Sequence, residues 1–152
     1  MVVAMAVNAS FAGRTYPATA PYAVGREKIR EFAEAVGAAD VVHYDQRQAR
    51  ARGYRDVIAS PTFAVLIAQK CEAQLIDDPE AGIDFSRVVH GEERFVHHRP
   101  ITAGDEVVSV LTVDSVKEAG GHAMVTTRCE LSTTEGEPVS TVTSTLVIRG
   151  GE

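Results

Sequence analysis

Histidine is the residue type in this sequence that bears most directly on chemistry, because its imidazole both transfers protons and ligates metals near neutral pH. Four of the five histidines lie in the second half of the chain: His90, His97, His98 and His122. His97 and His98 are adjacent, so in a strand their side chains point to opposite faces and cannot chelate one ion in the regular way. No spaced pair of carboxylates completes a ligand set. We interpret these residues as surface or interface histidines and expect no metal and no other cofactor.

Two hydroxyl side chains, Ser60 and Thr62, suggest a nucleophile with a helper residue. The Gly-x-Ser-x-Gly elbow that exposes a nucleophilic serine does not surround them. Ser is a favoured N-cap, and Pro61 suits the first helical position, where its missing N–H would have no partner anyway. The interpretation is therefore that Ser60 caps the start of a helix.

The composition limits the class of protein. The chain has 152 residues, 45% of them hydrophobic, so it is able to bury a core, and we expect a single domain over residues 1–152. Its 21 acidic and 15 basic residues give a formal net charge of −6, which argues against a nucleic-acid-binding protein. Cys71 and Cys129 are too few and too far apart for a disulfide framework or a zinc ribbon. We interpret both as buried, reduced thiols.

Apolar segments in the sequence favour a cytoplasmic protein that does not contact a membrane. No segment approaches the ~20 apolar residues of a membrane span. Residues 1–7 are apolar but lack the basic region of a signal peptide, and Asn8-Ala9-Ser10 only faintly resembles a cleavage site.

Two helices are predicted from the spacing of apolar residues. Residues 26–36 place four of them at i, i+3, i+4 and i+7, on one face: Ile29, Phe32, Ala33 and Val36. Gly37 is then expected at the C-terminal cap. A second helix is predicted from Ser60 to the Asp77-Asp78-Pro79 segment. It is apolar nearly all round over its first two turns, which is typical of a buried helix.

The second half of the chain predicts strands, at residues 87–99, 105–117, 122–133 and 139–149. Gly120-Gly121 is expected to form a hairpin, and residues 134–138 a turn. A short strand is predicted earlier, at 14–17. The order of elements favours an α+β architecture in which a long central helix is wrapped by a curved antiparallel sheet. The pattern fits a hot-dog fold, and it also fits a cystatin-like or other helix-on-sheet fold.

Three stretches resemble the FAS1-like, MaoC-type dehydratase family, which has the hot-dog fold. They are residues 22–33, which resemble the first helix of that family, 49–63, which resemble its loop into the central helix, and 88–95 with 98–105, which resemble the start of its sheet. Within the family the sequence is most similar to the A-type subunits of actinobacterial (3R)-hydroxyacyl-acyl-carrier-protein dehydratases. In those enzymes the A-type subunit mainly shapes the acyl channel, and a B-type partner supplies the catalytic pair.

The catalytic motif of this family is Asp-x-Asn-Pro-x-His, and the matching segment here is degenerate. His43 matches the His, but Ala38 stands in the Asp position, Asp40 in the Asn position and Val41 in the Pro position. Elimination of water from a β-hydroxyacyl thioester needs an acid and a base within hydrogen-bond reach. Alanine transfers no proton. Asp40 stands two residues late, which displaces its carboxylate by several Å.

A second departure lies at the start of the central helix. Active relatives have a glycine there whose N–H polarises the thioester carbonyl, and Pro61 stands near that position without an N–H. The resemblance also implies substrate contacts by Ser60, Thr62 and Phe63, although Phe63 equally suits the core.

The leading hypothesis is an acyl-thioester-binding subunit of a (3R)-3-hydroxyacyl-ACP or -CoA dehydratase (enoyl hydratase) of fatty-acid metabolism. Its partner is expected to be a motif-complete catalytic hot-dog subunit, in a heterodimer, or a second copy in a homodimer, because pairing covers the sheet edge. Two alternatives are a non-catalytic acyl-binding or scaffold homodimer, and a self-sufficient hydratase that uses His43 with Asp40.

Overall fold

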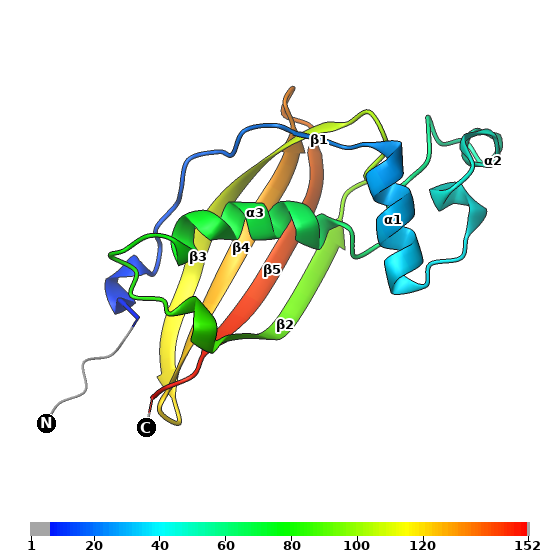
Figure 1. Cartoon of the computed structure of the whole chain (residues 1–152). Coiled ribbons are helices and arrows are strands. Elements are labelled where there is room, and N and C mark those ends of the chain that lie inside the picture. Colours follow the sequence, from blue (N-terminus) through cyan, green and yellow to red (C-terminus); the bar gives the residue numbers. More distant parts are fainter. Residues whose placement is uncertain (1–6, 152) are drawn as a thin grey trace, which may run out of the picture.

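A curved antiparallel sheet with one long helix lying across its face forms the body of the protein (Figure 1). The structure is a computed structural model, and it describes residues 7–151. Residues 1–6, on which the expectation about a signal peptide falls, lie outside the described residues. The main strands are β2 (Val88–His97), β3 (Glu106–Ala119), β4 (His122–Thr133) and β5 (Pro138–Ile148). Each begins and ends within two residues of its prediction.

The order of strands across the sheet is β1-β3-β4-β5-β2, and every neighbouring pair is antiparallel. Strands β3 and β4 are joined by the two-residue hairpin at Gly120 and Gly121, whose φ angles of 60° and 79° are those of a type I′ turn. Strand β2 precedes β3 in the chain but pairs with β5, so it forms one edge of the sheet.

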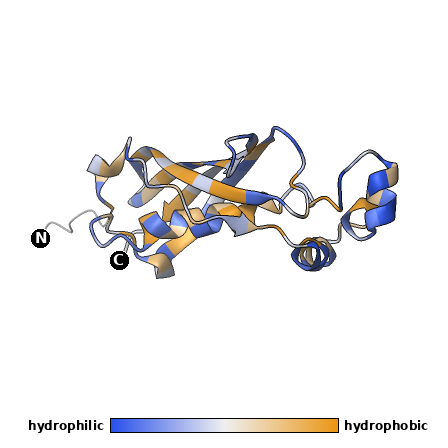
Figure 2. Ribbon diagram, turned by 90° about the horizontal axis from the view of Figure 1, so that it is seen from above, coloured by the Kyte–Doolittle hydropathy of each residue, from blue (hydrophilic) through white to orange (hydrophobic). Residues whose placement is uncertain are grey.

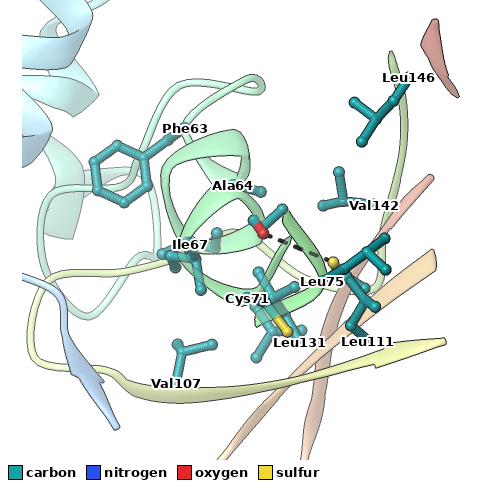
Figure 3. Packing of buried hydrophobic residues seen from close by; sticks show 14 of the residues in the cluster. Phe63, Ala64, Ile67, Cys71, Leu75, Val107, Leu111, Leu131, Val142 and Leu146 are labelled. Carbon is teal, nitrogen blue, oxygen red and sulfur yellow. Dashed lines mark hydrogen bonds between the residues drawn. The ribbon is translucent and has the colours of Figure 1, made fainter. Parts of the chain in front are cut away.

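The central helix α3 (Ala64–Ile76) packs on the concave face of the sheet (Figures 1 and 3). Its buried residues include Ile67, Cys71 and Leu75, which meet Leu111 and Leu131 from the strands. The helix is buried, as its nearly continuous apolar run predicts. This arrangement, one helix enclosed by a curled antiparallel sheet, is the hot-dog fold, and the α+β prediction is confirmed.

The beginning of α3 differs from its prediction. The α-helix starts at Ala64, and Ser60 does not cap it, because the Ser60 hydroxyl accepts no capping hydrogen bond. Instead, the N–H of Phe63 donates to the carbonyl of Ser60 at 3.0 Å, and the N–H of Val65 donates to the carbonyl of Thr62 at 3.1 Å. These i to i−3 bonds wind the first turn more tightly than an α-helix, so the backbone carbonyl replaces the side-chain cap.

The strand predicted at residues 14–17 is wrong. Only an isolated bridge joins Thr15 to Thr112 there, and the short strand β1 lies at Tyr22–Ala23, paired with β3. The segment still runs beside β3, since the N–H of Tyr16 donates to the carbonyl of Leu111 at 2.9 Å. Pro17 has no N–H and therefore interrupts a continuous ladder.

Helices α1 (Arg26–Val36) and α2 (Gln46–Ala51) lie together beyond one end of α3, away from the body of the sheet (Figures 1 and 2). Helix α1 has its predicted bounds, and Gly37 ends it with a φ of 72°. Asp45 is the N-cap of α2, and its side chain accepts the N–H of Gln48. Asp56 ties the helices to the body, since it accepts hydrogen bonds from Arg26 at 2.8 Å and from Gln46 at 3.0 Å.

We predict that Phe63→Ala lowers the free energy of unfolding by about 3–5 kcal/mol, because the ring is fully buried and packs edge-on against Phe32 at 5.5 Å. The matched control is Phe85→Ala, whose ring is 68% exposed, and its effect should stay within about 0.5 kcal/mol. Urea unfolding measures both changes. A Phe63→Ala variant as stable as its parent would mean that this side chain faces a channel rather than the core.

Candidate active site

A pocket of about 430 Å³ lies where three loops meet, at the end of the sheet that carries α1 and α2. Residues 40–43 and 52–54 form one wall, 58–61 form the floor, and 97–101 form the other wall. The polar side chains that line it include His43, Asp40, Arg52, Ser60 and His97. The segments are far apart in the sequence, so the pocket exists only in the folded chain.

Backbone hydrogen bonds hold the loops of the pocket together. The N–H of Ile58 donates to the carbonyl of Val42 at 3.1 Å, and the N–H of Ala59 donates to the carbonyl of Ile101 at 2.8 Å. A small second core of Val42, Ala49 and Ile58, with Tyr54 against it, packs beneath. The residues 58–59 therefore connect both walls, which fixes the shape of the pocket.

His43 is the buried histidine of the pocket, with 7% of its surface exposed. Its Nδ1 lies 2.7 Å from the carbonyl oxygen of Ile58. A carbonyl only accepts, so Nδ1 carries the proton and donates it. The Nε2 atom of a neutral imidazole is then a proton acceptor. The fold thus fixes the tautomer that a general base in this pocket requires.

Asp40 lines the same pocket, but its carboxylate already has partners. It caps the short 3₁₀ helix at Val41–His43 by accepting the N–H of Val42 at 3.1 Å, and it forms an ion pair with Arg52 at 2.8 Å. The hydrogen bond from Val42, together with Arg52, holds the pKa of Asp40 below its usual value. A carboxylate of this kind stays ionised and is a weak proton acceptor.

Ala38 follows the end of α1 and is absent from the residues that line the pocket. Its N–H donates to the carbonyl of Ala33 at 2.8 Å, beside the left-handed Gly37, as in a Schellman cap. A methyl group at this position supplies no acid or base.

Ser60 brings an unsatisfied polar atom to the floor of the pocket. The residue is 4% exposed, and its Oγ has no hydrogen-bond partner among the described residues. A buried hydroxyl without a partner is costly in a folded protein, and such a group commonly meets a ligand or water. The adjacent Pro61 offers no N–H, and its carbonyl accepts a hydrogen bond from Nε2 of His97 at 2.7 Å.

The other two residues predicted to contact substrate lie away from the pocket. Thr62 is exposed on the turn before α3, and Phe63 is fully buried in the core. The structure therefore brings together His43, Asp40 and Ser60, and it leaves Thr62 and Phe63 outside the lining.

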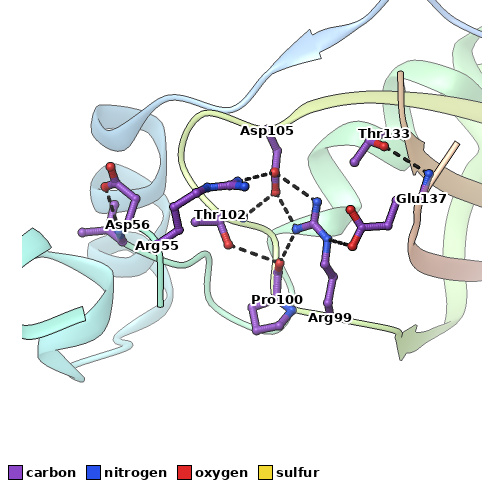
Figure 4. A network of polar contacts seen from close by, with 9 residues as sticks. Arg55, Asp56, Arg99, Pro100, Thr102, Asp105, Thr133 and Glu137 are labelled. Atoms are coloured by element: carbon purple, nitrogen blue, oxygen red, sulfur yellow. Dashed lines mark hydrogen bonds and ion pairs between the residues drawn. The ribbon is translucent and has the colours of Figure 1, made fainter. Parts of the chain in front are cut away.

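A buried ionic network supports the wall of the pocket at residues 97–101 (Figure 4). Asp105, with 3% of its side chain exposed, accepts two hydrogen bonds from Arg99, at 2.8 and 3.1 Å. It accepts others from Arg55 at 2.8 Å and from the N–H of Thr102 at 2.8 Å. Burial alone raises the pKa of Asp105, but these hydrogen bonds outweigh it and hold the pKa below its usual value.

Sequence reasoning missed part of this site. Four residues of the site or its support have partners 12 or more positions away in the sequence, which local spacing does not encode: Arg52, His97, Arg99 and Asp105. The one available signal was the motif Ala103-Gly104-Asp105, which the family resemblance included without a role.

The remaining histidines are exposed and lie apart from a shared ligand set. His97 contacts Pro61 and Ser140, and His98 contacts Thr141, at 3.3 Å. Within residues 7–151, no group of three or more potential ligands is placed to hold a metal ion. In the same range, no helix is both long and apolar enough to cross a membrane.

The fold and the pocket place this chain in the MaoC-like class of hot-dog dehydratases. The family model described as "FAS1-like, dehydratase domain region" matches residues 10–142, and the chain belongs to that family.

Similar proteins agree with this assignment. A "UPF0336 protein" of Saccharopolyspora erythraea is 53% identical over 146 residues, which cover 96% of this chain and 94% of that protein. A chain of the HadBC (3R-hydroxyacyl-ACP dehydratase) complex from Mycobacterium tuberculosis is 31% identical with a TM-score of 0.81, covering 90% of this chain and 96% of that one. A "MaoC-like dehydratase" is 32% identical with a TM-score of 0.85, covering 93% of this chain but 43% of that longer one.

The network around Asp105 gives a prediction for stability. Asp105→Ala leaves Arg99 and the Thr102 amide without their buried acceptor, and the free energy of unfolding should fall by about 3–5 kcal/mol. Asp114→Ala, which removes an exposed ion pair with Arg128, is the control and should change it by at most about 1 kcal/mol. Because the pKa of Asp105 is lower in the folded state, the difference between parent and variant should persist above about pH 4 and shrink as the pH falls below it. Equal losses in the two variants would contradict the buried network.

The hydrogen bond of His43 gives a prediction for nuclear magnetic resonance. At a pH where the imidazole is neutral, the ¹⁵N chemical shifts of His43 should show its proton on Nδ1. His122 provides an internal control, because its Nδ1 accepts the N–H of Gly150 at 3.0 Å and its proton must therefore lie on Nε2. A His43 protonated on Nε2 would contradict the arrangement at Ile58.

Proposed function

We propose that this chain is the acyl-thioester-binding subunit of a (3R)-3-hydroxyacyl-ACP or -CoA dehydratase in fatty-acid metabolism, and that it needs a motif-complete hot-dog partner. The observation that carries this proposal is a pocket that holds half of an acid–base pair. His43 has a fixed tautomer and a buried hydroxyl nearby, but the position of the family's carboxylate is Ala38.

The chemistry supports a need for the partner. Reversible dehydration moves a proton from the α-carbon and another to the departing hydroxyl, and acid and base each contribute about 10²- to 10⁴-fold to such a step. Asp40 is engaged by Arg52 and the Val42 amide, and Pro61 has no N–H to offer the thioester carbonyl. A pocket with these substitutions still binds a polar group through Ser60, while a complete pocket on another subunit performs the proton transfers.

The open edge of the sheet supports the pairing. Strand β2 lies at the end of the strand order, and its side chains Val89 and Val96 are 45% and 49% exposed. An edge strand of this length normally finds a partner. The similar chain in the HadBC complex belongs to an assembly of two subunit types, which favours a heterodimer over a homodimer.

A self-sufficient hydratase is the second candidate, and one observation favours it. Asp40 and His43 line the same pocket, so both reach one bound substrate. The partners of Asp40 weigh against it, since a carboxylate with a lowered pKa accepts a proton poorly. A non-catalytic scaffold homodimer remains the third reading.

The test is hydration of crotonyl-CoA by the chain alone and with a co-expressed hot-dog protein that carries the full Asp-x-Asn-Pro-x-His motif. The chain alone should be no faster than its His43→Ala variant. The complex should be faster by at least about 10²-fold, because it restores the acid–base pair.

Two outcomes would contradict this proposal. A rate of the chain alone that is lost in both the His43→Ala and Asp40→Asn variants would establish the self-sufficient hydratase. A stable homodimer that associates with no motif-complete partner and binds acyl thioesters without hydrating them would favour the scaffold.

A further inference from the structure

A second pocket lies apart from that of His43. The ends of β4 and β5 that contribute to it lie at the end of the sheet opposite α1 and α2 (Figure 1). It is open and has a volume of about 590 Å³. The residues that line it come from the turn before β2, the start of β4 and the end of β5: Ser86, Arg87, His122, Arg149 and Gly150. None of these lining residues is acidic, although the whole chain has a net charge of −6.

Backbone pairing holds the two arginines of this pocket beside each other. The N–H of Arg149 donates to the carbonyl of Arg87 at 3.0 Å, and Nη1 of Arg87 lies 3.5 Å from the carbonyl of Arg149. Within residues 7–151, Arg87 forms a long ion pair with Asp84, at 3.5 Å, and Arg149 forms none. Two cationic side chains that line one pocket repel each other, and an anion bound there would offset that repulsion.

His122 adds a donor of fixed orientation. Its Nδ1 accepts the N–H of Gly150, so the neutral ring carries its proton on Nε2. The hydroxyl of Ser86 already donates to Asp84 at 2.6 Å. The side chains of Arg87, His122 and Arg149 therefore present hydrogen-bond donors to the pocket, and an anion with several acceptor oxygens complements them.

We propose that Arg87, His122 and Arg149 bind the phosphate of the pantetheine carrier of the acyl chain. The shared chemistry is a phosphate ester, present both in coenzyme A and in the 4′-phosphopantetheine arm of a carrier protein. The identity of this ligand rests on the proposed function, since a dehydratase of either kind receives its acyl chain on such an arm.

The edge strand explains why this cluster serves a pocket so far from it in the same chain. In the dimer that this proposal requires, two β2 strands pair antiparallel across a two-fold axis with residue 88 of one opposite residue 97 of the other. Arg87 precedes the first of these positions, and His97 and His98 line the candidate active site at the second. The cluster of one subunit thus lies at the mouth of its partner's pocket. In a heterodimer it lies beside the complete catalytic motif.

Binding to the full-length chain, measured by calorimetry, tests the site with 4′-phosphopantetheine, pantetheine, coenzyme A and 3′-dephospho-coenzyme A. Pantetheine, which lacks the phosphate, should bind at least about tenfold more weakly than 4′-phosphopantetheine, since charge-assisted hydrogen bonds are lost. Arg149→Gln and Arg87→Gln should each weaken the phosphate-bearing compounds by about tenfold and leave pantetheine unchanged. Arg47→Gln, on the exposed surface of α2, is the matched control and should have no effect.

The compounds also distinguish the phosphate next to the pantetheine from the 3′-phosphate of coenzyme A. Equal affinity for coenzyme A and 4′-phosphopantetheine supports the proposal, whereas a loss of affinity on removing the 3′-phosphate overturns it, because the cluster would then bind the nucleotide end of coenzyme A. Equal affinity for pantetheine and 4′-phosphopantetheine overturns the proposal, and so does normal phosphate binding by both arginine variants. Circular dichroism establishes that each variant is folded.

A kinetic measurement separates this proposal from the proposed function. In an active complex, Arg149→Gln should raise KM for crotonyl-CoA by about tenfold and leave kcat nearly unchanged, because the phosphate is remote from the reacting atoms. Hydration with an unaltered KM would overturn the phosphate site while leaving the dehydratase assignment intact. Phosphate-dependent binding without hydration in any complex would do the reverse.

Discussion

Burial of α3 is the constraint on which the rest of the structure depends. The helix is apolar on nearly every side, so no single flat surface covers it, and the sheet must curl around it. Strands β3, β4 and β5 supply the inward-facing residues, which alternate with outward-facing ones along each strand. The curl leaves the loops at one end of the sheet to fold over the start of α3, and those loops form the pocket of His43.

Hydrogen bonds connect the walls of the pocket to each other. The carbonyl of Ile58 accepts a hydrogen bond from Nδ1 of His43, and the N–H of Ile58 donates to the carbonyl of Val42, so one residue sets both the orientation of the imidazole and the position of the wall. On the opposite wall, Asp105 holds the side chain of Arg99 and the backbone N–H of Thr102 in place by accepting hydrogen bonds from both. The two walls of the pocket are thus each supported by hydrogen bonds from outside it.

The extent to which the structure follows from the sequence depends on the range of the interactions. Strand β4 and helix α1 were predicted with their observed bounds, because the alternation of a strand and the 3.6-residue period of a helix are local signals. The start of α3 and the segment around Pro17 were not, because a 3₁₀ turn and a broken ladder depend on which carbonyls lie nearby. Within the site, His43 and Ser60 were identified from a motif and a hydroxyl, whereas the contact of His97 with Pro61 spans 36 positions and leaves no local pattern.

The pairing of the edge strand β2 with β5, the last strand in the chain, has a consequence for synthesis on the ribosome. Strand β2 is made before β3 and β4, but its hydrogen-bonding partner is β5, some 50 residues later, at Pro138–Ile148. Until β5 has left the exit tunnel, β2 lacks its single neighbour in the sheet, and its exposed valines are open to association with other nascent chains. Sequence-distant pairing of this kind also slows folding.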